Sequence, residues 1–169
     1  MKFPIKLART GVVTVATAIA GSTATEPNSL WYKMQSKPSW QPPAWVFPVA
    51  WTALYGAITA SSAKVIVELD EREAEANNLG QREDAILERR SFKKALGINL
   101  VLNASWPAMF WQVRNNRLSA IEAGALALSS ADLARRAFRV SRGAGAALIP
   151  YVAWTTFATA LTTSIARRN

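Results

Sequence analysis

Five long stretches of the chain contain few or no charged residues, and short charged or proline-rich segments separate them. A helix needs roughly 20 predominantly apolar residues to cross the hydrocarbon core of a bilayer, and each stretch approaches that length. We therefore predict an all-α fold in which five transmembrane helices form an integral membrane bundle and one domain over residues 1–169. The predicted helices cover approximately 7–25, 44–66, 93–113, 118–136 and 144–166.

Two of these helices permit a second interpretation. Basic residues precede the first stretch, and small residues at Ala20-Gly21-Ser22 imitate a cleavage site, so this stretch also fits a signal peptide. The fourth stretch contains Glu122 and Asp132, and charged groups near the centre of a bilayer are costly. Asp132 is spaced i,i+3 and i,i+4 from Arg135 and Arg136, which favours an interfacial ion pair over a proton-relay or substrate role.

A charged segment at about 68–92 joins the second and third predicted helices. It combines strong helix formers with charges of both signs, and the sequence Asn-Asn-Leu-Gly interrupts it at 77–80. We expect the segment to prolong both helices into water. Docking of a partner protein is the alternative.

The formal net charge of +9 raises the possibility of nucleic-acid binding. The seven Trp lie in weakly charged stretches with the basic residues between them, a distribution that a multi-pass membrane protein has, so we exclude nucleic acid as a partner. The membrane lipid is the expected surrounding. Of the 20 Lys and Arg, 14 fall on the side of the N-terminus, and the positive-inside rule then predicts a cytoplasmic N-terminus and an external C-terminus.

The connection between the first two helices is unusual for a loop, because aromatic residues alternate with prolines. Proline fixes φ and removes a backbone donor, so this connection is expected to be a stiff, non-helical strap. Its aromatic side chains form either an interfacial belt or a lid over a cavity between helices. The residues concerned are Trp31, Tyr32, Pro38, Trp40, Pro42, Pro43 and Trp45.

Helical spacing places further aromatic and amide residues on shared faces. Asn99 and Asn103 lie on one face of the third helix, and an unsatisfied amide in lipid costs several kcal/mol, so both amides should point into the bundle. There they either bridge helices or orient a ligand. Three sets share faces: Phe47, Trp51 and Tyr55; Asn99, Asn103, Trp106 and Phe110; and Tyr151, Trp154 and Ala158.

Three blocks of sequence resemble the translocator protein family, the tryptophan-rich sensory proteins (TspO/MBR family). They are Trp31-Tyr-Lys-Met-Gln-Ser-Lys-Pro-Ser-Trp-Gln-Pro-Pro-Ala-Trp-Val-Phe-Pro48 followed by Trp51 and Leu54-Tyr55, then Asn103-Ala-Ser-Trp106 with Phe110-Trp111, and Pro150-Tyr-Val-Ala-Trp154 with Ala158 and Leu161. The resemblance covers about residues 21–161. The chain has Leu161-Thr162 where the family usually has Leu-Asn, and its C-terminal tail lacks the Tyr of the animal cholesterol-recognition pattern, so cholesterol is a doubtful ligand.

The resemblance implies a membrane receptor, sensor or transport-type protein that binds porphyrins in a Trp-rich cavity closed by the 1–2 loop. The tetrapyrrole is then a ligand, and no cofactor is required. Because the chain has neither His nor Cys, a bound porphyrin would lack its usual axial ligands, which favours a free-base or metal-saturated tetrapyrrole. The family's cavity positions match Trp31, Tyr32, Pro42, Trp51, Asn103, Ser105 or Trp106, Trp154 and Ala158, and the faces above add Tyr55, Asn99, Phe110 and Tyr151.

Two other functions remain open. Certain relatives degrade porphyrin in light, a reaction that the resemblance assigns to Trp51 and Trp154, although the sequence offers no evident general base, nucleophile or metal site. A regulatory or assembly role through helix packing is the third possibility. The small residues Ala104 and Ala108 permit close helix approach, and we expect a homodimer.

Overall fold

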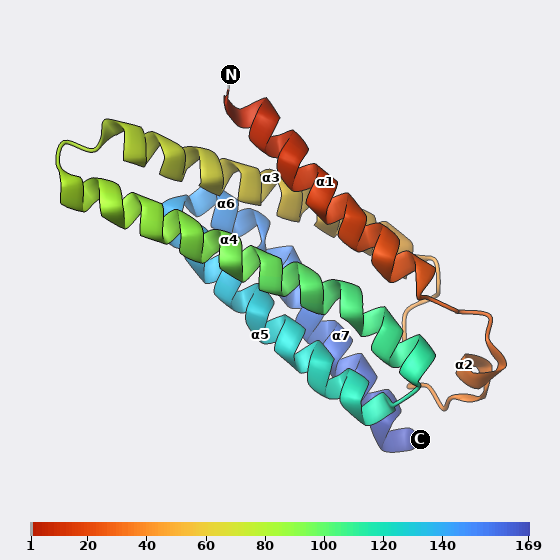
Figure 1. Cartoon of the computed structure of the whole chain (residues 1–169). Coiled ribbons are helices and arrows are strands. Elements are labelled where there is room, and N and C mark those ends of the chain that lie inside the picture. The colour runs from red at the N-terminus through yellow and green to blue at the C-terminus, as the bar shows by residue number, and fades with distance from the viewer. Residues whose placement is uncertain (1) are drawn as a thin grey trace.

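The computed structural model describes residues 2–169, which form five long helical segments side by side in one antiparallel bundle (Figure 1). The all-α prediction is confirmed. The elements in chain order are α1 (Lys2–Thr23), α2 (Leu30–Met34), α3 (Val46–Glu75), α4 (Leu79–Pro107), the π-helix η1 (Ala108–Val113), α5 (Asn116–Val140), α6 (Arg142–Ala147) and α7 (Ile149–Arg168).

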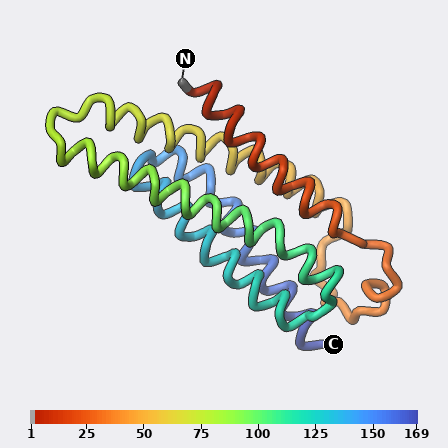
Figure 2. Tube along the Cα trace, in the orientation of Figure 1, coloured from red at the N-terminus to blue at the C-terminus, as the bar shows by residue number. Residues whose placement is uncertain are grey.

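The chain runs up and down the bundle, so that loops gather at two ends (Figure 2). The N-terminus, the α3–α4 turn and the α5–α6 connection lie toward one end. The short helix α2, the η1–α5 connection and the C-terminus lie at the other. Helix α1 packs against α3 and α4, and α5 packs against both α4 and α7. The strap, residues 24–45 including α2, therefore lies at the same end as the C-terminus.

The charged segment predicted as a loop at 68–92 is helical almost throughout. Helix α3 continues to Glu75 and α4 begins at Leu79, so only residues 76–78 form the turn. The Asn78 side chain caps α4 by accepting a hydrogen bond from the backbone N–H of Gln81 at 2.9 Å. The segment thus prolongs both helices, as its composition indicates, and the loop boundaries were wrong because helix formers fill both arms.

Other helix boundaries also differ from the predicted ranges. The first helix begins at Lys2 rather than near residue 7, the second at Val46 rather than 44, and the fourth extends to 116–140. The last predicted helix, 144–166, is broken at Leu148 between α6 and α7. Pro150 stands in the first turn of α7, where its missing N–H interrupts the hydrogen bonding of a continuous helix.

A proline also changes the third predicted helix. At Pro107 the α-helix α4 gives way to the π-helix η1, which ends at Arg114 in the left-handed region with φ 56°. Proline donates no backbone hydrogen bond, so a shift of the helical register is accommodated there. The wider turn leaves the consecutive residues Phe110 and Trp111 both buried. Single-turn π-helices of this kind are frequent at functional sites.

Several polar side chains are buried inside the bundle and several large apolar side chains are exposed on its surface, as expected for a protein in a bilayer. The interior contains polar side chains such as Thr14, Asn99 and Ser130, all at most 1% exposed. Large apolar side chains such as Val12 and Leu128 instead point outward. In lipid, polar groups must find partners inside the protein, whereas apolar groups gain nothing from burial, so this arrangement fits a membrane interior.

Among the described residues, two segments are long and apolar enough to cross a membrane by length and hydropathy alone, Phe3–Thr23 and Arg142–Arg168. The intervening helices carry Trp, Tyr, Asn and Ser within the bundle and charged residues at their ends, which lower their mean hydropathy. Hydropathy alone therefore identifies the first and last segments, and the middle three depend on further evidence.

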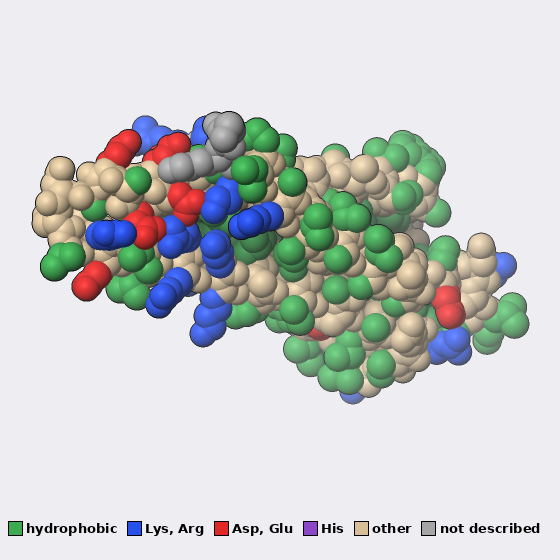
Figure 3. Space-filling model, turned by 45° about the horizontal axis from the view of Figure 1, so that its top comes forward, with side chains coloured by type: hydrophobic (Ala, Val, Ile, Leu, Met, Phe, Trp, Pro, Cys, Tyr) green, Lys and Arg blue, Asp and Glu red, His purple; other side chains and the backbone are tan. Residues whose placement is uncertain are grey.

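Ion pairs tie the charged hairpin to the first helix. Lys6 of α1 lies 2.7 Å from Asp70, which Arg89 also contacts at 2.6 Å, while Arg89 pairs with Glu73. Burial raises the pKa of Asp70, but the hydrogen bonds and charges of Lys6 and Arg89 outweigh that effect and hold the pKa below its ordinary value. Figure 3 shows Lys and Arg side chains gathered between this hairpin and the apolar part of the bundle.

The two acidic residues of the fourth predicted helix have different surroundings. Asp132 accepts hydrogen bonds from Arg135 and Arg136, each at 2.5 Å, so the expected ion pair is present. Glu122 is half-buried and lies about two turns from the start of α5. One carboxylate oxygen accepts a hydrogen bond from Ser105 at 2.5 Å, and the other, Oε2, is buried without a protein partner.

Candidate functional site

An aromatic cluster lies between the strap, η1 and the end of the bundle that bears the C-terminus, and its centre is Phe110. The Phe110 ring centroid is 5.3 Å from that of Trp31 and 5.2 Å from that of Trp106, which stacks on it with an interplanar angle of 12°. Tyr32 packs on Trp111 at 4.5 Å. We call this group the strap cluster; its aromatic members are Trp31, Tyr32, Phe47, Trp106, Phe110, Trp111 and Phe157.

Helix α7 contributes Phe157 to the strap cluster, and its Trp154 adjoins the cluster. The Trp154 ring lies 5.8 Å from Phe47 of α3 and 5.5 Å from Phe157, and Trp40 of the strap covers Phe157 at 5.8 Å. Aromatic side chains of α3, η1, α7 and the strap therefore meet at one end of the bundle. Such rings provide flat apolar surfaces against which a planar ligand can stack.

Three buried polar atoms around these rings have no hydrogen-bond partner in the described residues. They are the indole Nε1 atoms of Trp106 and Trp154 and the Oε1 atom of Gln41 in the strap. A buried polar group without a partner costs free energy, and native structures contain few of them. Two donors and one acceptor near the rings thus have no hydrogen-bond partner in the part of the chain that the structure describes.

Cationic side chains lie at the edge of the strap cluster. The Lys37 ammonium is 3.9 Å from the centroid of the Tyr32 ring, and the Arg114 guanidinium is 5.9 Å from that of Trp31. Burial raises the pKa of the Tyr32 phenol, although the hydrogen bond from Gln41 lowers it, so the hydroxyl is neutral at physiological pH. The positive charge at this edge comes from Lys37 and from Arg114, whose guanidinium also lies 3.8 Å from the Glu26 carboxylate.

Polar contacts connect the strap to neighbouring segments. The side chain of Asn169 accepts from the backbone N–H of Ser36 at 2.9 Å and donates to its carbonyl at 3.1 Å. Asn116 donates to the side chain of Gln35 at 2.7 Å. The Ser36 and Asn169 contacts are exposed, and exposed polar contacts stabilise weakly because water competes for the same groups.

A hydrogen-bonded network occupies the middle of the bundle. Tyr55 of α3 donates to Asn103 of α4 at 2.6 Å, and Asn103 donates to Tyr151 of α7 at 3.0 Å. Tyr151 donates to Asn99 at 2.8 Å, and Asn99 donates to Ser130 of α5 at 3.1 Å. We call these five residues the amide network. It joins four helices, and both functional groups of each amide have partners within the protein.

The sequence-predicted site residues divide between these two regions. Trp31, Tyr32, Trp106 and Phe110 belong to the strap cluster, and Trp154 adjoins it, whereas Tyr55, Asn99, Asn103 and Tyr151 form the amide network. Trp51 packs against the network tyrosines Tyr55 and Tyr151, at 5.5 and 6.4 Å. Pro42 and Ala158 are half-buried, and neither makes a side-chain hydrogen bond or ring contact with these groups in the described structure.

Four contributors to this end of the bundle were absent from the predicted site. Trp111 was missed because an ideal α-helix separates its face from that of Phe110, and only the π-turn after Pro107 buries both. Phe47 shares a helical face with Trp51 and could have been included on that ground. Phe157 and the strap residue Gln41 carry no distinguishing sequence signal. The four residues are Gln41, Phe47, Trp111 and Phe157.

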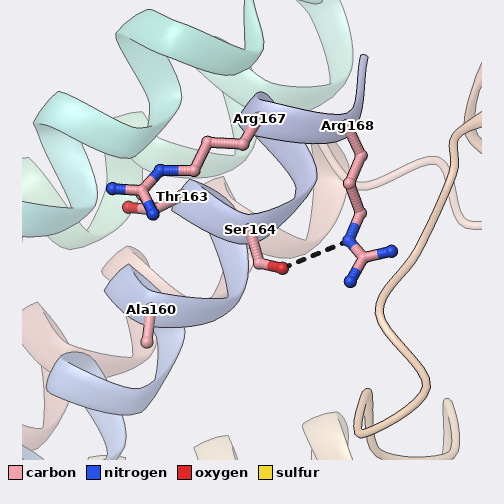
Figure 4. Close-up of a pocket in the computed structure, with 5 residues that line it drawn as sticks. All are labelled: Ala160, Thr163, Ser164, Arg167 and Arg168. Atoms are coloured by element: carbon pink, nitrogen blue, oxygen red, sulfur yellow. Dashed lines mark hydrogen bonds between the residues drawn. The ribbon is translucent and has the colours of Figure 1, made fainter.

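Two surface hollows lie away from the aromatic rings. One, of about 550 Å³, is open and lies along the C-terminal turns of α7 (Figure 4), where Arg168 lies 3.5 Å from Ser164. The other, of about 720 Å³, lies between α5 and α7 at the opposite end of α7. Neither contains a residue of the strap cluster or the amide network.

Comparison with known proteins identifies relatives over nearly the whole chain. The model of the TspO/MBR family matches residues 10–168. The chain is 31% identical to the tryptophan-rich protein TspO of Chlorobaculum tepidum over 92% of its own length and 90% of that protein. It is 30% identical to the protein CrtK of Rhodobacter capsulatus, over 92% and 89% of the two chains.

The similarity extends to animals. The translocator protein of Homo sapiens is 31% identical over 82% of this chain and 75% of the human protein. These matches confirm the family resemblance and the membrane helical bundle. With the family model covering all five helical segments, the chain belongs to the TspO/MBR family.

Proposed function

We propose that this membrane protein is a receptor or sensor that binds a porphyrin between the strap and the external half of the bundle, with the strap cluster as its stacking surface. The observation that carries the proposal is the group of unpartnered polar atoms at Trp106, Trp154 and Gln41. A porphyrin core offers a large planar π-surface for the rings and polar groups for these donors and this acceptor.

The charge at the edge of the cluster supports an acidic porphyrin. Protoporphyrin carries carboxylate side chains, and Lys37 and Arg114 lie against the outermost rings, Tyr32 and Trp31. A carboxylate near either cation forms a charge-assisted hydrogen bond, which is stronger than a neutral one. The flat core then lies against the rings and the acidic groups remain at the wetter edge.

Entry of the ligand requires the strap to move. The rings of the strap cluster contact one another at 4.5–6.5 Å, so a planar ligand must separate Trp31 and Tyr32 from Phe110 and Trp111. The hydrogen bonds of the strap to Asn169 and Asn116 break in this step. We propose that the strap is the lid of the site and that the amide network supports the bundle beneath it without contacting the ligand.

We further propose that the five helical segments each cross the membrane, with the N-terminus cytoplasmic. The excess of Lys and Arg on the N-terminal side supports this orientation. In sealed vesicles, external protease should then remove a C-terminal tag and spare an N-terminal one. The reverse pattern would contradict the orientation.

A protoporphyrin titration, first in the dark and then in light, tests the binding function. Binding should quench Trp fluorescence in the dark and leave the absorption of the pigment intact, because stacking places the porphyrin next to several indoles. Loss of the pigment's absorption only under illumination would instead identify the light-dependent degradation considered for Trp51 and Trp154. Absence of quenching in the dark would contradict the proposal.

A further inference from the structure

A second surface of the protein, the groove between α5 and α7, is independent of the porphyrin site. The groove has a volume of about 720 Å³ and lies at the end of α7 that is far from the strap. Most of its lining is apolar, with two guanidinium groups among the wall residues. The lining residues are Ala131, Ala134, Arg135, Phe138, Arg139, Ile149, Val152 and Ala153.

The α5 wall of this groove changes from apolar to basic along one helical face. Outward-facing Ile121 and Leu128 are 70% and 76% exposed, and the same face continues through Ala131 to Arg135 and Arg139. Residues three or four apart on a helix share a face, so these side chains form one continuous stripe. A stripe of this kind matches an amphiphile, with its chain against the apolar part and its head at the arginines.

The positive charge in the groove is only partly neutralised by the protein. Arg135 pairs with Asp132 at 2.5 Å, and Asp132 also binds Arg136, so one carboxylate is shared by two guanidiniums. Arg139 makes no ion pair with any described residue, and Arg142 follows at the start of α6. An anionic group at Arg139 and Arg135 is therefore complementary in charge to the groove.

Close packing of α6 fixes the shape of the groove beside Phe138. A Cβ atom added at Gly145 would lie 2.3 Å from Cγ of the Phe138 ring, so only glycine allows the ring to lie this close to α6. The ring forms one wall of the groove. A methyl group at residue 145 should displace that wall without changing any charge.

We propose that this groove binds one anionic phospholipid from the surrounding membrane, with an acyl chain along the apolar stripe and the phosphate at Arg139 and Arg135. The exposed apolar face below the arginines, together with the unneutralised charge of Arg139, distinguishes this occupant from a free anion. Basic pockets between transmembrane helices are sites of this type.

Native mass spectrometry of the purified full-length protein in detergent tests the proposal, with phosphatidylglycerol and phosphatidylcholine of identical acyl chains as probes. Phosphatidylglycerol should be retained in preference to phosphatidylcholine. Arg139→Gln should weaken its binding about fivefold, the typical effect of one basic residue near a membrane surface. Gly145→Ala should also weaken it, and Arg139→Lys should stay within about twofold of the wild type because the charge is kept.

Lys94→Gln is the matched control, because it removes one exposed positive charge from the same half of the bundle outside the groove. It should leave phosphatidylglycerol binding unchanged. Equal losses in Arg139→Gln and Lys94→Gln would overturn the proposal in favour of diffuse surface charge. Equal retention of phosphatidylcholine, or displacement of the lipid by inorganic phosphate at moderate concentration, would overturn it as well.

Discussion

The amide network and the strap cluster are neighbouring regions that differ in whether their buried polar groups have hydrogen-bond partners. In the amide network, every amide group of Asn99 and Asn103 has a partner, and the hydrogen bonds connect four helices. In and beside the strap cluster, the indole N–H groups of Trp106 and Trp154 are buried without one. Fully satisfied polar networks make an interior rigid, whereas unsatisfied groups are available to a ligand.

This difference separates residues that the sequence grouped together. Asn103 and Trp106 are one turn apart on α4, and the sequence made both candidate ligand-binding residues on one helical face. In the structure Asn103 bonds to Tyr55 and Tyr151, whereas Trp106 stacks on Phe110 with its N–H unpaired. Changes in one region should therefore alter stability, and changes in the other should alter binding.

The largest effect is expected from Trp106→Phe combined with Trp154→Phe. The change keeps most of the apolar area and removes both N–H donors, each worth about 1 kcal/mol, so the dissociation constant for protoporphyrin should rise roughly thirtyfold. Thermal stability should stay the same or increase, because two unsatisfied buried groups disappear. Fluorescence quenching and a thermal scan measure the two quantities.

Trp45→Phe is the control for that experiment, because Trp45 is 67% exposed and makes no ring contact with the cluster. It should change neither binding nor stability. If the double variant binds protoporphyrin as tightly as the wild type, the indole N–H groups of Trp106 and Trp154 do not contribute to binding. That result would contradict the role given to the strap cluster.

The second effect concerns stability and comes from Asn103→Leu. The substitution removes the hydrogen bonds to Tyr55 and Tyr151, and at about 0.6 kcal/mol for an average interhelical bond in a membrane the loss should be about 1 kcal/mol. Protoporphyrin affinity should remain within about twofold. Thr52→Val, which removes an exposed hydroxyl bonded only within its own helix, should cost less.

If Asn103→Leu leaves the stability unchanged and greatly weakens porphyrin binding, the two regions have the opposite roles to those proposed. In that case the amide would orient the ligand, which is the other role open to it from the sequence.

The smallest equilibrium effect is expected from the strap. Asn169→Ala removes the two hydrogen bonds to the Ser36 backbone, which should speed hydrogen exchange over residues 30–40 and raise the association rate of protoporphyrin severalfold. Affinity should change by less than about threefold, since these bonds are exposed. Gln112→Ala, at an exposed position of η1 in the same end of the bundle, should leave both rates unchanged. Slower association in Asn169→Ala would contradict a lid role for the strap.

The sequence predicted the helices and most of the aromatic residues, because charge-free stretches and Trp-rich motifs are local signals. It did not distinguish the two regions. Asn103 and Trp106 share a helical face, and which of them is satisfied depends on Tyr55 and Tyr151, residues 48 positions away in each direction. Trp111 was missed for a local reason. The residues after Pro107 form a π-helix, and the 3.6-residue period of an α-helix does not predict which of them share a face.

The indole N–H signals of the seven Trp, followed by ¹⁵N NMR during a protoporphyrin titration in the dark, test the central claim most directly. The account predicts that the signals of Trp106 and Trp154 shift strongly as their N–H groups gain a partner beside a porphyrin ring, while the signal of Trp45 and the side-chain amide signals of Asn99 and Asn103 stay nearly fixed. Shifts confined to the two amides, with Trp106 and Trp154 unmoved, would contradict it.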